Sequence, residues 1–227
     1  MLNYLVGIQS SFVLNTRMMR LNNTVDKRDF VIGSIITMVM ATLFSLIGGL
    51  PLIVTFVPGL FFSWITFLYL FKNKIEIPGL EKFLPVFVLL LAWQFIHFNE
   101  EFITGFYKQF PELYGTKAYS KEKFVSINMI SYALFVLASV LVLKYKRNFL
   151  LIPVLFFIIY GAIGNAIAHS WWSFSLQRYF PGLYTAQFYW LLGPWVLLKL
   201  IGSKRIVSTI ILLFGVILIF LITYFKA

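Results

Sequence analysis

Residues 149–173 read FLLIPVLFFIIYGAIGNAIAHSWWS, a run that contains no lysine, arginine, aspartate or glutamate. An α-helix needs about 20 mostly apolar residues to cross the hydrocarbon core of a bilayer, so this run predicts a transmembrane helix. Two polar residues, Asn165 and His169, stand four apart in it and therefore share one helix face. Glycines and alanines surround them and allow a neighbouring helix to approach closely. The run thus predicts a membrane fold with a polar site inside it.

The composition of the whole chain agrees with a membrane fold. Of its 227 residues, 60% are hydrophobic, and the mean hydropathy is +0.88. Such a chain has too little polar surface for a soluble globule. The absence of cysteine excludes disulfides, thiolate nucleophiles and Cys-ligated zinc or iron–sulfur centres. Any metal must therefore be held by nitrogen and oxygen ligands.

We expect an all-α fold, a polytopic membrane helix bundle of about seven transmembrane helices. The division between the first two rests on the sequence Gly-Gly-Leu-Pro at 48–51, which favours a tight break. Residues 1–29 lack the pattern of a signal peptide and are interpreted as an N-terminal interfacial segment, followed by a single transmembrane domain at 30–227. The expected spans are 30–50, 52–71, 83–107, 125–143, 149–173, 183–201 and 206–225.

The net charge of +11 comes from lysines and arginines dispersed over the ends of the apolar segments. This dispersal argues against a nucleic-acid partner. With seven spans, thirteen of the nineteen basic residues fall on one side of the membrane and six on the other. Because lysine and arginine are enriched on the cytoplasmic side, the N-terminus is predicted to be cytoplasmic. The expected location is a cell membrane, with its lipids as partners.

A second informative stretch, HFNEE at 97–101, carries two of the eight carboxylates of the chain. At 100° per residue, four other polar side chains of this helix lie within about 60° of His97. An acidic residue at mid-bilayer costs roughly 2.5–3.5 kcal/mol on insertion scales, so such residues mark a functional site. The four residues that share the face of His97 are Gln94, Glu100, Glu101 and Thr104.

The two polar stretches are expected to meet, since their helices run in the same direction and carry the motifs in their last halves. Imidazole and carboxylate are the ligands of zinc hydrolases and of non-haem iron or manganese sites. We predict that His97, Glu101 and His169 bind a divalent metal ion, with zinc preferred and iron or manganese as alternatives. Glu100 and Glu101 are both predicted to be catalytic, the glutamate that does not bind the metal, here Glu100, serving as general base, and Asn165 is predicted to orient a ligand or an oxyanion.

The depth of this site favours a lipid or another amphiphile as substrate, because such a molecule can reach it laterally between helices. The function predicted first is therefore that of a metal-dependent membrane hydrolase or transferase. The residues predicted to bind its substrate are Gln94, Thr104, Trp93, Trp172 and Tyr184.

Other functions use the same residues. The polar groups form, in one alternative, a purely structural cluster worth about 0.6 kcal/mol per hydrogen bond. In another they serve a proton- or ion-coupled transporter, or an immunity-type protein that binds an amphiphile without catalysis. A metal-free acid–base lipid isomerase is a third alternative. A transporter predicts a polar route to both faces, whereas the segments 83–91 and 149–159 carry no ionisable residue and favour a pocket closed on the cytoplasmic side.

Three ordered motifs of this chain resemble those of the bacterial HXXEE domain proteins. They are HFNEE at 97–101, NAIAH at 165–169 and YFPGLYT at 179–185. The resemblance covers about residues 83–200. It implies a multi-helix domain in the bacterial cytoplasmic membrane, and it adds little about the substrate.

Overall fold

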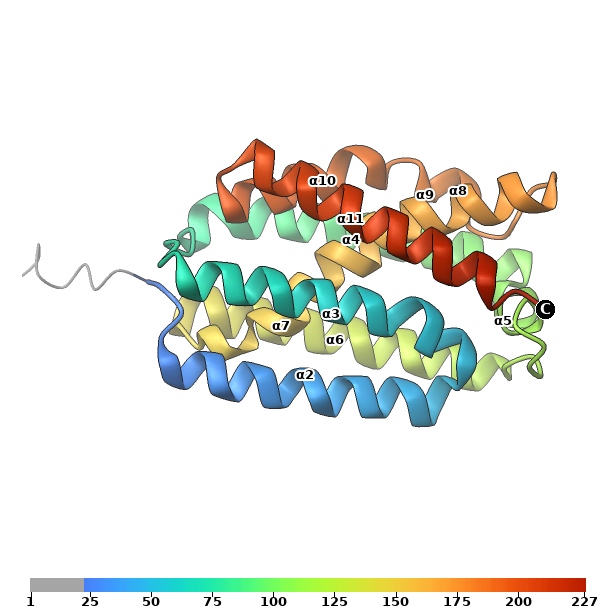
Figure 1. Cartoon of the computed structure of the whole chain (residues 1–227), viewed down its shortest axis with the longest axis horizontal. Helices are drawn as coiled ribbons and strands as arrows, with labels where there is room; N and C mark the ends of the chain where they lie inside the picture. The colour runs from blue at the N-terminus through green and yellow to red at the C-terminus, as the bar shows by residue number, and fades with distance from the viewer. Residues whose placement is uncertain (1–22) are drawn as a thin grey trace, which may run out of the picture.

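The computed structural model describes residues 23–227, and every regular element in that part of the chain is helical. The passes run back and forth along one axis, so that the start of α2 and the C-terminus lie at opposite ends of the bundle (Figure 1). The helices are α2 (Lys27–Gly48), α3 (Leu50–Lys72), α4 (Leu80–Thr104), α5 (Phe106–Glu112), α6 (Lys121–Tyr145), α7 (Leu151–Phe156), α8 (Asn165–Leu176), α9 (Leu183–Ala186), α10 (Tyr189–Ile201) and α11 (Lys204–Tyr224). The expected all-α bundle is confirmed.

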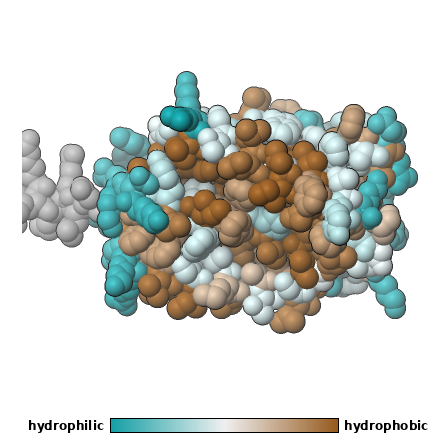
Figure 2. Space-filling model, viewed as in Figure 1, coloured by the Kyte–Doolittle hydropathy of each residue, from teal (hydrophilic) through white to brown (hydrophobic). Residues whose placement is uncertain are grey.

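The surface of the bundle matches a bilayer. Apolar side chains cover its middle, and hydrophilic residues gather at its two ends (Figure 2). In residues 23–227, six helical passes are long and apolar enough to cross a membrane. Large side chains such as Met38 and Leu46 are 64% and 78% exposed on this surface, which suits contact with lipid. The chain is a multi-pass membrane protein.

The expected count of seven full-length spans is not confirmed, because the segment 183–201 forms two pieces, α9 and α10. Between them, Gln187, Phe188 and Trp190 donate their amides to carbonyls three residues back, which replaces the α-helical pattern with tighter turns. The 13 residues of α10 reach about 20 Å. This is short of the roughly 30 Å of a hydrocarbon core.

The sharp turn between α2 and α3 is where the Gly-Gly-Leu-Pro sequence predicted it. Gly49 has φ 63° and ψ −150°, a backbone conformation open to glycine. Pro51 stands in the first turn of α3, where its missing N–H costs no helical hydrogen bond. The tight break is confirmed.

The first helix begins earlier than expected. Asp26 and Asp29 form a capping box, in which the Asp29 amide donates to Asp26 Oδ1 at 2.7 Å, and this fixes the start of α2 at Lys27 and not at residue 30. The interfacial segment expected at residues 1–29 falls for the most part on residues 1–22, which lie outside the described residues.

The run 149–173 forms the centre of the bundle. A 3-10 turn, η1 (Asn148–Leu150), leads into α7, and a π-helix, η2 (Phe157–Gly164), joins α7 to α8 in one continuous pass. Every residue of α7 and all but one of η2 are buried. Neighbouring helices approach this pass so closely that a Cβ on Gly193 of α10 would lie 2.6 Å from Ile163 Cγ1. The π-helical segment, a feature that often marks functional sites, directly precedes Asn165 and His169.

Candidate metal centre and cavity

Two residues of α4 bring nitrogen and carboxylate ligands to one buried point. His97 and Glu101 are one helical turn apart, and both are buried, as is Gln94 one turn earlier. The His97 Nε2 atom lies 3.4 Å from Glu101 Oε1. This spacing confirms that the polar face expected on this helix turns inward at these three positions.

The third ligand comes from α8. His169 is fully buried, and its Nε2 atom lies 3.2 Å from the same Glu101 Oε1. The centroids of the two imidazole rings are 4.9 Å apart. One ligand atom from each of His97, Glu101 and His169 lies within 4.8 Å of the others. The predicted approach of the two helices is thus confirmed.

The geometry of this cluster suits a divalent cation. Zinc bonds of about 2.0–2.1 Å in a tetrahedral site separate ligand atoms by roughly 3.3–3.4 Å, close to the 3.2 and 3.4 Å found around Glu101. In the described part of the chain, His97 Nε2 and His169 Nε2 lie 3.4 and 3.2 Å from Glu101 Oε1 without the geometry of a hydrogen bond, and these two atoms and His169 Nδ1 are buried without a hydrogen-bond partner. Buried polar atoms normally have one. Three protein ligands, two imidazoles and a carboxylate, also leave a position open, as catalytic zinc sites do.

The other ring nitrogen of His97 is fixed by Thr185. His97 Nδ1 lies 2.8 Å from Thr185 Oγ1, and the Thr185 hydroxyl also contacts Glu100 Oε2. An ionised carboxylate has no proton to give, so the hydroxyl donates to Glu100 and accepts from His97 Nδ1–H. The lone pair of the neutral imidazole then lies on Nε2, which faces Glu101 and His169. Metal-binding histidines are commonly oriented by such an outer hydrogen bond.

Glu100 does not join the cluster, although it was predicted as the general base beside the metal. Its carboxylate accepts from the Tyr179 hydroxyl at 2.7 Å, from the Tyr184 amide at 3.1 Å and from the Thr185 amide at 2.8 Å, besides the Thr185 hydroxyl. The two amides belong to the first turn of α9. The reason is helical phase: Glu100 and Glu101 are 100° apart, so they face different neighbours. Glu100 positions α9 and, through Thr185, His97.

Tyr179 remains a proton donor to Glu100. Burial raises the pKa of its hydroxyl, and the hydrogen bond to the Glu100 carboxylate raises it further. The neutral phenol is therefore kept at physiological pH. The contact orders the turn between α8 and α9, which covers the histidines.

Gly182 in this turn touches the cluster directly. Its φ is +88°, and a Cβ placed on it would lie 2.6 Å from His169 Cε1 and 3.0 Å from Glu101 Cγ. Both the backbone conformation and the space therefore demand glycine. The FPGL turn at 180–183 lies against His169 and shields one side of the centre.

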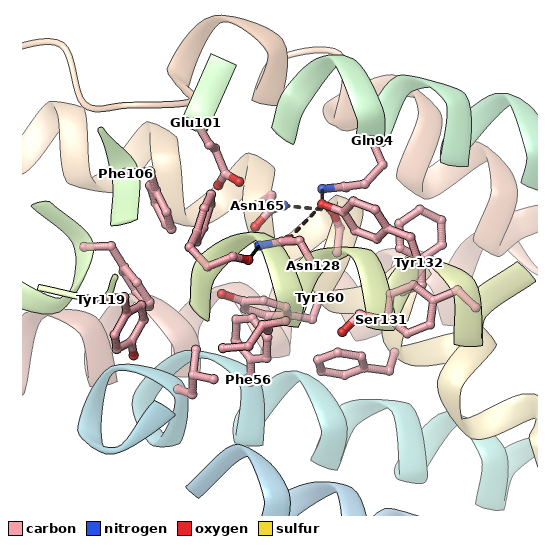
Figure 3. A pocket seen from close by; sticks show the side chains of 18 residues that line it. Phe56, Gln94, Glu101, Phe106, Tyr119, Asn128, Ser131, Tyr132, Tyr160 and Asn165 are labelled. Atoms are coloured by element: carbon pink, nitrogen blue, oxygen red, sulfur yellow. Dashed lines mark hydrogen bonds between the residues drawn. The ribbon is translucent and has the colours of Figure 1, made fainter. Parts of the chain in front are cut away.

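A cavity of about 80 Å³ lies on the other side of Glu101. This is room for a few water molecules, since about 10–15 Å³ of such volume holds one. Glu101 and Asn165 line it, and Figure 3 shows the Glu101 carboxylate pointing into it. Asn165 donates one amide hydrogen to the Gly161 carbonyl at 3.0 Å. Its second N–H and its oxygen are left for a ligand, as its predicted role requires.

Gln94, Tyr132 and Asn128 form one wall of the cavity and are joined by hydrogen bonds (Figure 3), and Tyr189, behind this wall, extends the chain. Tyr189 donates to Gln94 Oε1 at 2.6 Å, Gln94 Nε2 donates to the Tyr132 hydroxyl at 2.9 Å, and Tyr132 donates to Asn128 Oδ1 at 2.8 Å. Gln94 thus lines the cavity as predicted, with its amide already engaged. The remaining walls are aromatic and include Phe56, Phe106, Phe135 and Phe156.

Four residues predicted to bind substrate do not line this cavity. Trp93 donates to the Thr185 carbonyl at 2.9 Å, and Thr104 donates to the Glu100 carbonyl at 2.6 Å. Trp172 is buried against His169, with ring centroids 5.2 Å apart. Tyr184 is 69% exposed and meets the site through its backbone amide. These residues build the surroundings of the centre.

The sequence analysis did not single out four residues that the structure places at the site. Thr185 and Gly182 lie in the YFPGLYT motif at 179–185, which the sequence marks through the family resemblance and through a weak repeat of FPELY at 110–114 in FPGLY at 180–184, neither of which assigns these two residues a role. Asn128 and Tyr132 stand four apart in the apolar helix expected at 125–143. The spacing that drew attention to Asn165 and His169 would have identified this second pair.

Comparison of the chain with protein-family models, with curated proteins and with solved structures found no match. The resemblance to the HXXEE domain proteins therefore stays a prediction.

Proposed function

We propose that this chain is a metal-dependent membrane enzyme, a hydrolase or transferase that acts on a lipid or another amphiphile. The observation that carries the proposal is the convergence of His97, His169 and Glu101, with unpartnered ring nitrogens, beside a cavity inside the bundle. Zinc is the preferred ion because it favours two imidazoles and one carboxylate with an open position. Iron and manganese accept the same ligand types.

The metal centre, Glu101 and Asn165 each have a distinct role in the proposed reaction. A divalent cation in such a centre supplies Lewis-acid chemistry, polarising a substrate oxygen and acidifying water. Glu101 turns Oε1 to both histidines. Its other oxygen receives no hydrogen bond from the described residues and is suited to accept a proton. Asn165 offers an N–H to a developing oxyanion.

The charges of the centre also favour a cation. Glu101 is buried, and the negative charge of its ionised carboxylate would be balanced by a cation held between the two histidines. An uncompensated charge in a low-dielectric interior is costly. Glu100 lies outside the cluster, and its charge is already stabilised by four donors, so the cation is needed for Glu101 alone.

The shape of the cavity supports an enzyme over a transporter. Toward the end of the bundle where α2 begins, the pass through Leu151–Ile159 is buried and apolar, and Phe135, Phe156 and Phe157 close the cavity there. A relay to that face would need polar groups along this path. With the N-terminus cytoplasmic, as the distribution of basic residues favours, the metal centre lies nearer the outer face.

Metal content tests the proposal. The detergent-purified native protein and the variants His97→Ala, His169→Ala and Glu101→Gln would be washed with the same chelator and measured by mass spectrometry. We expect near-stoichiometric zinc in the native protein and its loss in all three variants. Glu112→Gln, which alters an exposed carboxylate of α5, is the matched control and retains the metal. A native protein that holds no metal even after reloading would contradict the proposal and leave the acid–base isomerase or the structural cluster.

The role of Thr185 provides a second test of the same centre. Thr185→Val removes the acceptor of His97 Nδ1–H, and loss of such an outer partner typically weakens metal binding about 10–100-fold. Thr185→Ser keeps the hydroxyl and retains the native affinity. Competition with a zinc-binding dye measures both. Equal affinity in the two variants would show that Thr185 does not orient His97.

Catalysis is tested by incubating the metal-loaded protein in vesicles of membrane lipid extract and following lipid products by mass spectrometry. We expect a hydrolysed or transferred product with the native protein and none with His169→Ala. A lipid product of unchanged mass, formed equally without metal, would instead identify the isomerase.

A further inference from the structure

A long groove opens between α2 and α6 beside the catalytic cavity. Its volume is about 610 Å³, and its lining is almost entirely apolar, with Met40 and Phe44 from α2 and Ile130, Leu134 and Leu141 from α6 among its residues. From Lys123 to Leu141, the α6 wall is about 27 Å long. The groove therefore extends along most of the roughly 30 Å hydrocarbon thickness.

The groove lies on the face of α2 that turns away from α3: α2 packs along α3, where Trp64 Nε1 donates to Ser34 Oγ at 3.0 Å, and it is tied to the α6 side only near its two ends. At one end, Tyr119 donates to the Gly48 carbonyl at 2.6 Å. At the other, the Phe149 amide donates to Asp29 Oδ1 at 3.2 Å. Between these contacts α2 presents few buried residues, and it lies along the outer edge of the bundle (Figure 1). The space between its middle and α6 is left to an apolar occupant.

The groove lies directly beside the cavity that contains Glu101. Leu52, Ile127, Ser131 and Phe135 line both. An acyl chain in the groove would therefore lie against the side chains that separate it from the cavity, so that a substrate from the bilayer would approach the centre from the side and not across the polar end of the bundle.

A cation stands at the end of the groove nearest the metal centre. Lys123 is the one ionisable residue of its lining, and its Nζ lies 4.4 Å from the centroid of the Tyr119 ring, which itself lines the cavity. A lysine at this position favours an anionic headgroup. Ile127 and Ser131 follow Lys123 by one and two helical turns, about 6 and 12 Å. The ester linkage below a phosphate bound to Lys123 would thereby lie beside Ile127 and Ser131, which line both the groove and the cavity.

We propose that the groove between α2 and α6 binds an anionic phospholipid of the surrounding bilayer, with an acyl chain in the groove, the phosphate at Lys123 and an acyl ester at the cavity. The identity of the reaction rests on the proposed function. In the hydrolytic form, water adds to the ester carbonyl carbon while Glu101 accepts its proton. The carbon–oxygen ester bond then breaks, and the proton passes to the leaving alkoxide, giving a fatty acid and a lysophospholipid.

Lipid retention tests the proposal independently of catalysis. The protein would be reconstituted in vesicles of phosphatidylcholine containing a minor fraction of phosphatidylglycerol, extracted gently, and examined by native mass spectrometry. We expect the native protein to retain phosphatidylglycerol in preference to phosphatidylcholine. Lys123→Ala should lower this preference about fivefold. Lys117→Ala, an exposed lysine at the same end that does not line the groove, leaves it unchanged.

A second pair of variants tests the groove itself. Leu134→Trp fills it, since Leu134 is among its lining residues, whereas Val136→Trp places the same bulk on an exposed α6 position outside it. We expect loss of retained lipid in the first variant alone. Equal retention of both lipids, or equal behaviour of the two tryptophan variants, would overturn the proposal.

The two proposals fail in different ways. If lipid retention depends on Lys123 and Leu134 in a protein that binds no metal, the lipid-binding groove is supported and the metal-dependent enzyme is contradicted. If Leu134→Trp forms the metal-dependent lipid product as fast as the native protein, the enzyme is supported and the lipid-binding groove is contradicted.

Discussion

Two passes of this bundle have nearly the same hydropathy and opposite surroundings. In the pass Asn148–Leu176, 83% of the most apolar stretch is buried inside the protein, whereas the corresponding share of α2 is 6%. The buried pass carries Asn165 and His169 within a cluster of glycines and alanines at 161–168, and α2 carries none of the site. Hydropathy measures whether a helix prefers the membrane, and small and polar residues decide whether it faces protein or lipid. The buried pass Asn148–Leu176 therefore contributes His169 to the candidate metal centre, whereas the exposed helix α2 borders the apolar groove.

The largest expected effect is on the buried pass. Ile159→Ala removes a fully buried side chain of η2. The cavity left behind should lower the free energy of unfolding by about 2 kcal/mol or more. Reversible unfolding in mixed detergent, followed by circular dichroism, measures it. A loss below about 0.5 kcal/mol, the range of ordinary surface substitutions, would break the comparison.

A somewhat smaller effect, on metal affinity, is expected at Gly182, where the turn at 180–183 contacts His169. Gly182→Ala forces a Cβ against His169 and should weaken zinc binding about 10–100-fold, because an outer-shell contact is displaced. Gly202→Ala is the matched control, since Gly202 also has positive φ, +76°, and nothing lies within 4 Å of its Cβ. Both variants lose some stability through backbone strain, and the loss of metal affinity is expected in Gly182→Ala alone. Equal zinc affinities would show that the turn does not support the centre.

Tyr119→Phe should have an effect of about 1 kcal/mol, the usual contribution of one hydrogen bond, because it releases the end of α2. Hydrogen exchange near Gly48 should rise while exchange in α8 stays unchanged. Faster exchange throughout the bundle would show that α2 is not separately fastened.

The pH dependence of the same variant sharpens this test. Burial raises the pKa of the Tyr119 hydroxyl well above its ordinary value near 10. The unfolded chain therefore loses this proton first, and the stability contributed by Tyr119 is present below about pH 10 and falls as pH rises above it. Tyr119→Phe should lose less stability than the native protein between neutral and strongly alkaline pH. The exposed Tyr224→Phe serves as the control, and an identical alkaline loss in Tyr119→Phe and the native protein would contradict the assignment.

The smallest effect is expected on the outer face of α2. Leu46 is 78% exposed to the surroundings. Leu46→Ala should change the free energy of unfolding by less than about 0.5 kcal/mol. The same unfolding assay, run beside Ile159→Ala, completes the comparison. A cost equal to that of Ile159→Ala would indicate that a second surface covers α2.

The meeting of side chains from α4 and α8 at Glu101 shows how much of the site could be predicted from the sequence. Because period and spacing place side chains on helix faces, His97, Glu101, His169 and Asn165 could be found before any contact was known. The role of Glu100 could not, since it depends on which neighbour occupies the space 100° around the helix. The positions of Trp93 and Trp172 were open for the same reason: an aromatic ring packs equally well in a core or beside a cavity.

The sequence by itself determined that this chain crosses a membrane as an all-α bundle and that two polar helix faces interrupt its apolar surface, because hydropathy and helical period are local properties of the chain. The tertiary structure decided the rest. The segment at 183–201 forms two helices, α9 and α10. Glu100 binds Thr185, whereas Glu101 contacts the two histidines. A groove separates α2 from α6. Those outcomes depend on contacts between residues far apart in the chain, and in lipid such contacts are chosen by close packing and by hydrogen-bond partners, since lipid tails are as apolar as the helices themselves.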